Sequence, residues 1–118
     1  MVSQCTLAHS VRATGIGVHT RQKVLITLRP APVNTGITFH QKLGDTTVKI
    51  PASLASVDGS VAMSTALRNE DNRVGTVEHL LSAFVGMGVD NAIVEVDAPE
   101  LPIMDGSAAP FVFLIQSA

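Results

Sequence analysis

The chain has 118 residues, of which 46% are hydrophobic and 15% charged, and its formal net charge at pH 7 is -2. This length accommodates one domain around a single core, and the composition excludes a disordered chain. The weak negative charge and the absence of tyrosine and tryptophan argue against a nucleic-acid-binding protein.

The chain shows no sign of export or of membrane insertion. Its single cysteine, Cys5, excludes an internal disulfide. The first residues lack the basic start and the apolar stretch of a secretory signal, and the apolar runs are far shorter than the ~18 to 20 residues that a membrane span requires. We therefore expect a cytoplasmic protein with no transmembrane segment.

The first half of the chain predicts short antiparallel strands. Apolar and polar residues alternate through residues 23–29, which is the period of a strand, and the prolines of residues 30–32 end it. Further strands are predicted at residues 37–39 and 48–50. Residues 14–20 interrupt the extended segment at the start of the chain. They contain Gly15 and Gly17 but not the third glycine of a dinucleotide-binding loop, so we interpret them as a turn or bulge.

The second half begins with a predicted strand at residues 64–68 and a polar turn at residues 69–72. A first helix is predicted from Thr76, which is a good N-cap, to Gly86 or Gly88. Its apolar face consists of residues that recur at helical spacing, namely Val77, Leu80, Leu81 and Phe84.

A buried strand at residues 92–96 and a second helix are predicted to complete the domain. Asp105 or Ser107 can cap this helix, which runs through residues 111–115 with Pro110 in its first turn. The order of elements indicates an α+β fold, in which two helices pack on a sheet of mainly antiparallel strands.

Both predicted helices have more apolar surface than one sheet can cover. Glu78 is the only charged residue between residues 77 and 85, and residues 106–118 contain none. A helical wheel nevertheless places four residues opposite the apolar face of the first helix, namely His79, Ser82, Ala83 and Gly86. We therefore expect a second domain or another copy of the chain to cover the helices. For the second helix alone, burial within this domain is the alternative.

Glu78 and His79 are the only carboxylate and imidazole that adjoin in the sequence. The positive end of the helix dipole disfavours a protonated imidazole, so we expect His79 to be neutral, the form that binds Zn²⁺. Glu78 could accept a proton from an attacking water. The alternative is structural, with Glu78 complementing the helix dipole and His79 making a local hydrogen bond.

No complete metal site is visible in the sequence. The four histidines are far apart, and neither H-E-x-x-H nor C-x-x-C occurs. A catalytic zinc takes about three protein ligands, so the remaining ligands would have to come from outside this chain.

Four segments, residues 13–19, 76–83, 88–91 and 102–111, together resemble the UDP-3-O-acyl-N-acetylglucosamine deacetylases. The resemblance implies a bacterial, cytoplasmic, zinc-dependent hydrolase of lipid A and lipopolysaccharide biosynthesis, which removes the acetyl group from an acylated UDP-sugar. It also implies two similar α+β domains with helices sandwiched between their sheets and the active site at their interface. Residues 1–118 would be the N-terminal domain, without its C-terminal partner.

The resemblance also assigns residues. It makes His79 the first zinc ligand and Glu78 the general base, and it places two groups of residues at the substrate cleft, namely Val18 and His19, and Met63, Ser64 and Thr65. The remaining zinc ligands belong to the missing half, so we expect no turnover from the isolated chain. The alternative is a non-catalytic, truncated paralogue that acts as a binding or regulatory module. The expected partner is the C-terminal half of the deacetylase, or another copy of the chain that associates through the uncovered helix face.

Overall fold

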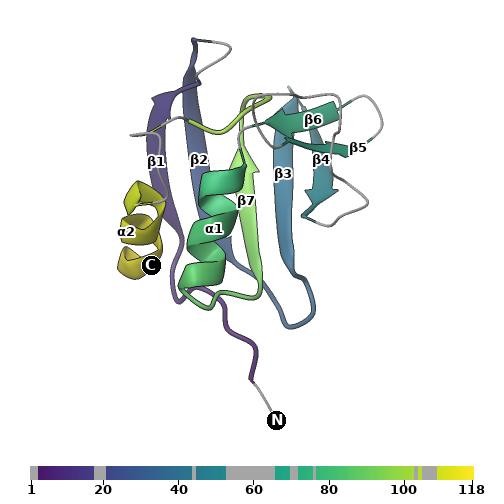
Figure 1. Cartoon of the computed structure of the whole chain (residues 1–118). Coiled ribbons are helices and arrows are strands. Elements are labelled where there is room, and N and C mark those ends of the chain that lie inside the picture. Colours follow the sequence, from purple (N-terminus) through teal and green to yellow (C-terminus); the bar gives the residue numbers. More distant parts are fainter. Residues whose placement is uncertain are drawn as a thin grey trace.

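A five-stranded sheet underlies the molecule, and two helices cover one of its faces (Figure 1). The computed structural model describes residues 3–17, 21–43, 45–52, 66–69, 72–75, 77–102, 104 and 109–118. The elements are β1 (Val11–Ile16), β2 (Lys23–Pro30), β3 (Ile37–Leu43), β4 (Thr46–Pro51), β5 (Ala66–Asn69), β6 (Asn72–Gly75), α1 (Glu78–Gly86), β7 (Ala92–Val96) and α2 (Ala109–Ser117).

The large sheet has the strand order β1-β2-β7-β3-β4, and β5 and β6 form a separate antiparallel pair. Within the large sheet, β3 and β7 are parallel and the other neighbours are antiparallel. The predicted α+β class, with mainly antiparallel strands and two helices, is therefore confirmed. Among the described residues, no helix is long and apolar enough to cross a membrane.

The alternation predicted for residues 23–29 is the pattern that the sheet shows. Val24, Ile26 and Leu28 are fully buried on the side of the helices, whereas Lys23, Leu25 and Arg29 are exposed on the other side. β7 lies between β2 and β3, and its bounds agree with the predicted strand. This central position explains why three of its five residues are buried.

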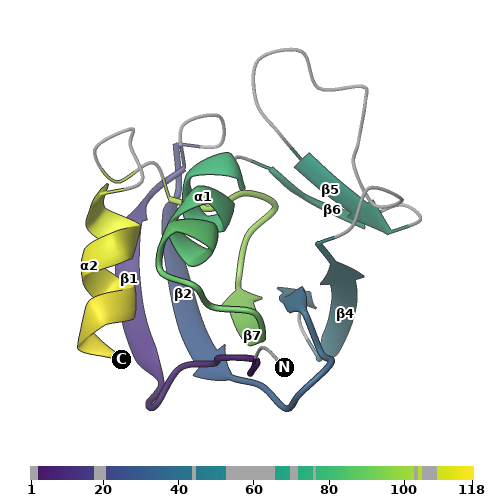
Figure 2. The ribbon, with the colours of Figure 1, turned by 60° about the horizontal axis from the view of Figure 1, so that its bottom comes forward.

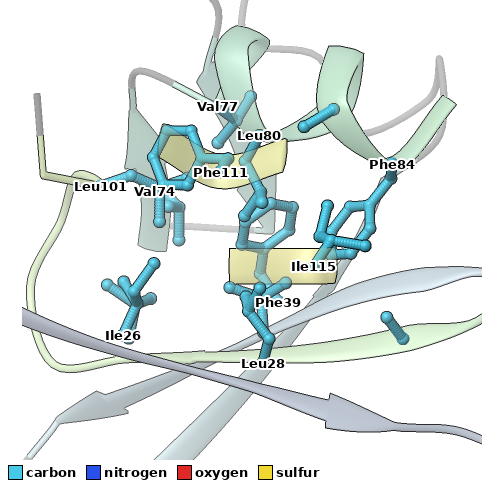
Figure 3. Packing of buried hydrophobic residues seen from close by; sticks show 14 of the residues in the cluster. Ile26, Leu28, Phe39, Val74, Val77, Leu80, Phe84, Leu101, Phe111 and Ile115 are labelled. Carbon is cyan, nitrogen blue, oxygen red and sulfur yellow. The ribbon is translucent and has the colours of Figure 1, made fainter. Parts of the chain in front are cut away.

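The two helices close the core from above the sheet. Leu80 and Phe84 of α1 and Phe111 and Ile115 of α2 point toward the same cluster as Phe39 of the sheet (Figure 3). Pro110 is the second residue of α2, in the first turn as predicted, where its missing N–H removes no helical hydrogen bond. The predicted caps Thr76, Asp105 and Ser107 lie outside the described residues.

The segment at residues 88–91 has a structural role. The Asp90 carboxylate accepts a hydrogen bond from the backbone N–H of Cys5 at 2.8 Å. Buried Asn91 accepts one from the backbone N–H of Gly36 and donates one to the side chain of Gln4, each at 2.8 Å. These bonds tie the N-terminal segment and the loop before β3 to the start of β7.

Two predictions of local structure were wrong. Residues 15 and 16 belong to β1 and do not form a turn, because Gly15 pairs in register with Val24. The first helix begins at Glu78, with Val77 at the N-cap position and no side-chain cap. The predicted polar turn at residues 69–72, in contrast, agrees with the hairpin of β5 and β6, in which Asn69 pairs with Asn72; its two central residues lie outside the described part of the chain.

The buried face of α1 also differs from the prediction. Ser82 and Gly86 are exposed as expected, but Ala83 is only 1% exposed, and the buried face is centred near Leu80. The reason is that α2 packs beside α1, so that α1 is covered on the side of α2 as well as on the side of the sheet. Ala83 has the small side chain that such a close approach requires.

Candidate functional site

Glu78 and His79 are the first two residues of α1. Val77, directly before them, is fully buried, and its carbonyl accepts the hydrogen bond from Leu81 N–H that closes the first turn. The helix therefore holds the backbone of the pair rigidly, while an acidic residue in the first turn complements the helix dipole.

The two side chains are only partly exposed, with 34% of Glu78 and 31% of His79 accessible. Nε2 of His79 lies 3.9 Å from Oε1 of Glu78. This distance is too long for a hydrogen bond, and the contact is an ion pair only when the imidazole is protonated. The pair can thus offer a carboxylate and an imidazole to a third group without first breaking a hydrogen bond between them.

The loop that follows β7 fixes the position of this end of α1 (Figure 2). Gly75, the last residue of β6, donates its N–H to the carbonyl of Pro99 at 2.7 Å and accepts from Leu101 N–H at 3.0 Å. One residue further, Pro102 packs so closely on β1 that a Cβ built on Gly15 would lie 2.6 Å from its Cβ. The start of α1 is therefore anchored to two strands of the large sheet through one loop.

The structure brings Glu78 and His79 together but does not test the other predicted site residues. Val18, His19, Met63, Ser64 and Thr65 all lie outside the described residues. A second histidine, His40, lies on the sheet face that points away from the helices, with Glu95 as its partner in β7 and Lys49 in β4.

One buried carboxylate was not singled out by the sequence analysis. Glu100 is only 3% exposed and its backbone forms an isolated bridge with Gly75, three residues before Glu78. Its only signal in the sequence is its place in a proline-flanked loop directly after a buried strand.

The described residues do not by themselves fit a zinc ion. They contain no group of three histidine, cysteine, aspartate or glutamate side chains close enough to hold a metal. A catalytic zinc needs about three protein ligands, and here one imidazole and one carboxylate are adjacent. A zinc site that includes His79 must draw its other ligands from residues beyond those described.

Comparison with known proteins gives matches over the whole chain. It is 59% identical over 118 residues to the UDP-3-O-acyl-N-acetylglucosamine deacetylase of Teredinibacter turnerae. It is 58% identical over the same length to the proteins of that name from Pseudomonas entomophila and Coxiella burnetii. In each case the chain covers 39% of the relative's length.

The family model described as LpxC, UDP-3-O-acyl N-acetylglycosamine deacetylase, matches residues 4–118. This match includes both helices and every strand of the two sheets. The chain belongs to the LpxC family.

Proposed function

We propose that this chain is the N-terminal domain, residues 1–118, of a zinc-dependent deacetylase of lipid A biosynthesis. The substrate class is the one in the relatives' name, a UDP-3-O-acyl-N-acetylglucosamine, from which the 2-acetyl group is hydrolysed. Glu78 serves as the general base, and His79 supplies one zinc ligand. The other ligands come from a C-terminal half, and the protein works in the cytoplasm.

The Glu78–His79 pair carries this proposal. Both side chains are partly exposed on the first turn of a well-anchored helix, in a chain whose described residues provide no third ligand. Glu78 can accept a proton from the water that attacks the acetamide, and rigid placement keeps its carboxylate in reach of that water. Bound zinc would polarise the amide carbonyl.

The outer surface of the helix layer supports the second half of the proposal. Val85 of α1 is 82% exposed and Phe113 of α2 is 72% exposed. α2 contains no charged residue, and Glu78 is the only one in α1. A surface of this kind is costly in water and is typical of an interface. In the proposed protein, the C-terminal half covers it.

A complementation experiment tests the proposal. The chain is mixed with a separately produced C-terminal part of the Pseudomonas entomophila relative, and zinc content and acetate release are measured. We expect one zinc per complex and activity only from the mixture. Glu78→Gln should lower activity by roughly 100-fold or more while zinc remains, because a general base contributes about 10²- to 10⁴-fold. His79→Ala should lose the zinc.

Ser82→Ala is the matched control, because Ser82 is exposed on the same helix and should be dispensable. An active complex that tolerates Glu78→Gln would refute the assigned base. A stable complex that stays inactive with zinc would instead favour the non-catalytic binding module.

A further inference from the structure

The sheet face that points away from the helices is rich in cations. Strand alternation places five lysines and arginines there, on four of the five strands, and all of them are exposed: Arg12, Lys23, Arg29, Lys42 and Lys49. We call this surface the outer sheet face. Both helices lie on the opposite side of the sheet (Figures 1 and 2).

The outer sheet face is positive although the chain as a whole is negative. The face also carries two carboxylates, Glu95 and Asp97, so that its five cations leave a net charge of +3. Since the whole chain carries -2, the rest of the molecule carries -5. The turns beside the face do not alter this balance, because Arg21 and Asp45 cancel.

Part of this charge is already compensated. Glu95 lies 3.5 Å from Arg29 and 3.6 Å from Lys42, so one carboxylate is shared between two cations at the centre of the face. The cations are distributed from one edge strand to the other, across about 19 Å at the usual strand spacing. This spread suits an extended anionic surface, whereas a single small anion would need cations that converge on one point.

Aliphatic side chains lie among the cations at the β1–β2 edge. Ile16 is 49% exposed and Leu25 is 38% exposed, and Ile16 lies directly opposite Lys23 in the register of the two strands. The described part of this face carries no phenylalanine, tyrosine or tryptophan on which a base could stack. Exposed aliphatic groups beside lysine and arginine are the combination that binds the headgroup region of anionic lipids.

We propose that the outer sheet face docks the protein peripherally on an anionic membrane surface. The cations attract the surface, and Ile16 and Leu25 insert at the level of the headgroups. This role goes beyond the proposed deacetylation and uses the side of the domain opposite to α1. The helix layer therefore remains available to the C-terminal half while the sheet contacts lipid.

Vesicle co-sedimentation tests the proposal, with the 118-residue chain and vesicles of phosphatidylcholine alone or with about 30% phosphatidylglycerol. We expect binding only to the anionic vesicles, and a steep loss of binding as NaCl rises from about 0.05 to 0.5 M. The double variant Arg12→Glu/Lys23→Glu should bind at least about 25-fold more weakly, since each cation contributes roughly fivefold.

The control is Arg68→Glu, which also reverses a positive charge but lies in the separate β5–β6 sheet. This variant should bind like the unaltered chain. Circular dichroism establishes that each variant is folded. The proposal would be overturned if the chain bound neutral and anionic vesicles equally, or if it did not bind anionic vesicles. It would also be overturned if charge reversal at Arg68 weakened binding as much as charge reversal at Arg12 and Lys23. The readout is independent of zinc and activity, so the proposed enzymatic function can fail while this one holds.

Discussion

Gly15 is required in β1 because another segment passes directly over it. A Cβ at this position would lie 2.6 Å from Cβ of Pro102 and 3.3 Å from Sδ of Met104. We expect Gly15→Ala to destabilise the domain by about 1–3 kcal/mol, the usual cost of overpacking. Urea unfolding measures this free energy. Gly86→Ala is the matched control, because nothing lies within 4 Å of its Cβ position at the end of α1.

The control should be neutral or stabilising by up to about 1 kcal/mol, since alanine favours helix. Equal losses at Gly15 and Gly86 would show that the contact with Pro102 does not constrain β1. Because that loop also anchors the start of α1, we further expect Gly15→Ala to weaken zinc retention in the complemented complex.

His40 gives the domain a pH dependence that can be measured. Burial lowers the pKa of His40 below its usual value of 6.5, and Lys49 and Arg29 lower it further, while Glu95 acts in the opposite direction. The unfolded chain therefore binds the proton more readily than the folded one. The resulting stability is present above about pH 6.5 and is lost as the pH falls through the folded pKa.

Urea unfolding between about pH 8 and 5 tests this sign. His40→Gln should flatten the decline in unfolding free energy on the acidic side of this window. The same substitution at exposed His9 controls for the loss of a histidine. A steeper acid decline in the His40 variant would contradict the lowered pKa.

At the scale of elements, α2 offers two phenylalanines with opposite environments. Phe111 is 1% exposed and points into the core (Figure 3). Phe113, in contrast, is 72% exposed. Phe111→Ala should cost about 3–5 kcal/mol through lost burial and a cavity, and Phe113→Ala less than about 0.5 kcal/mol. Thermal and urea unfolding of the two variants, two residues apart in one helix, compare them directly. Similar losses would mean that α2 is not docked as described.

The periodicity of apolar residues predicted the strands whose burial depends on a single packing surface. Residues of β2 alternate between apolar and polar, and those of β7 are mostly apolar, because both strands pack on one core. The bounds of β7 are as predicted, and β2 is one residue longer than predicted. Gly15 was misread because glycine weakens a strand on its own, and the contact with Pro102 that explains it spans 87 residues of sequence. Burial of Ala83 was missed for a similar reason, since it depends on a second helix.

The candidate site was predictable only in part for a different physical reason. Adjacent Glu78 and His79 are visible in any reading of the sequence, and the helix start places them on one turn. A metal site, however, is assembled from residues distant in sequence, and the described residues do not complete one. The role of the pair therefore remains a prediction.

At the scale of the whole molecule, the two faces of the domain have different surface chemistry. The outer sheet face carries five cations, whereas the helix layer exposes Val85 and Phe113 with almost no charge. Coulomb attraction acts at long range and weakens with salt, while burial of apolar surface persists at high salt. Raising the salt concentration should therefore release the chain from lipid without separating it from the proposed C-terminal half.

The proposed interface with a C-terminal half can be tested apart from catalysis. Val85→Asp and Phe113→Asp introduce charge into a surface that would be buried on association, so we expect binding to weaken by roughly 100-fold or more, through lost apolar burial and an unpaired charge. Both residues are exposed in the chain alone, so its unfolding free energy should barely change. Val33→Asp is the matched control, because Val33 is 66% exposed in the loop between β2 and β3. Isothermal titration with the C-terminal half measures the affinities. If the Val33 variant weakens binding as much as the helix variants do, the partner does not dock on the helix layer.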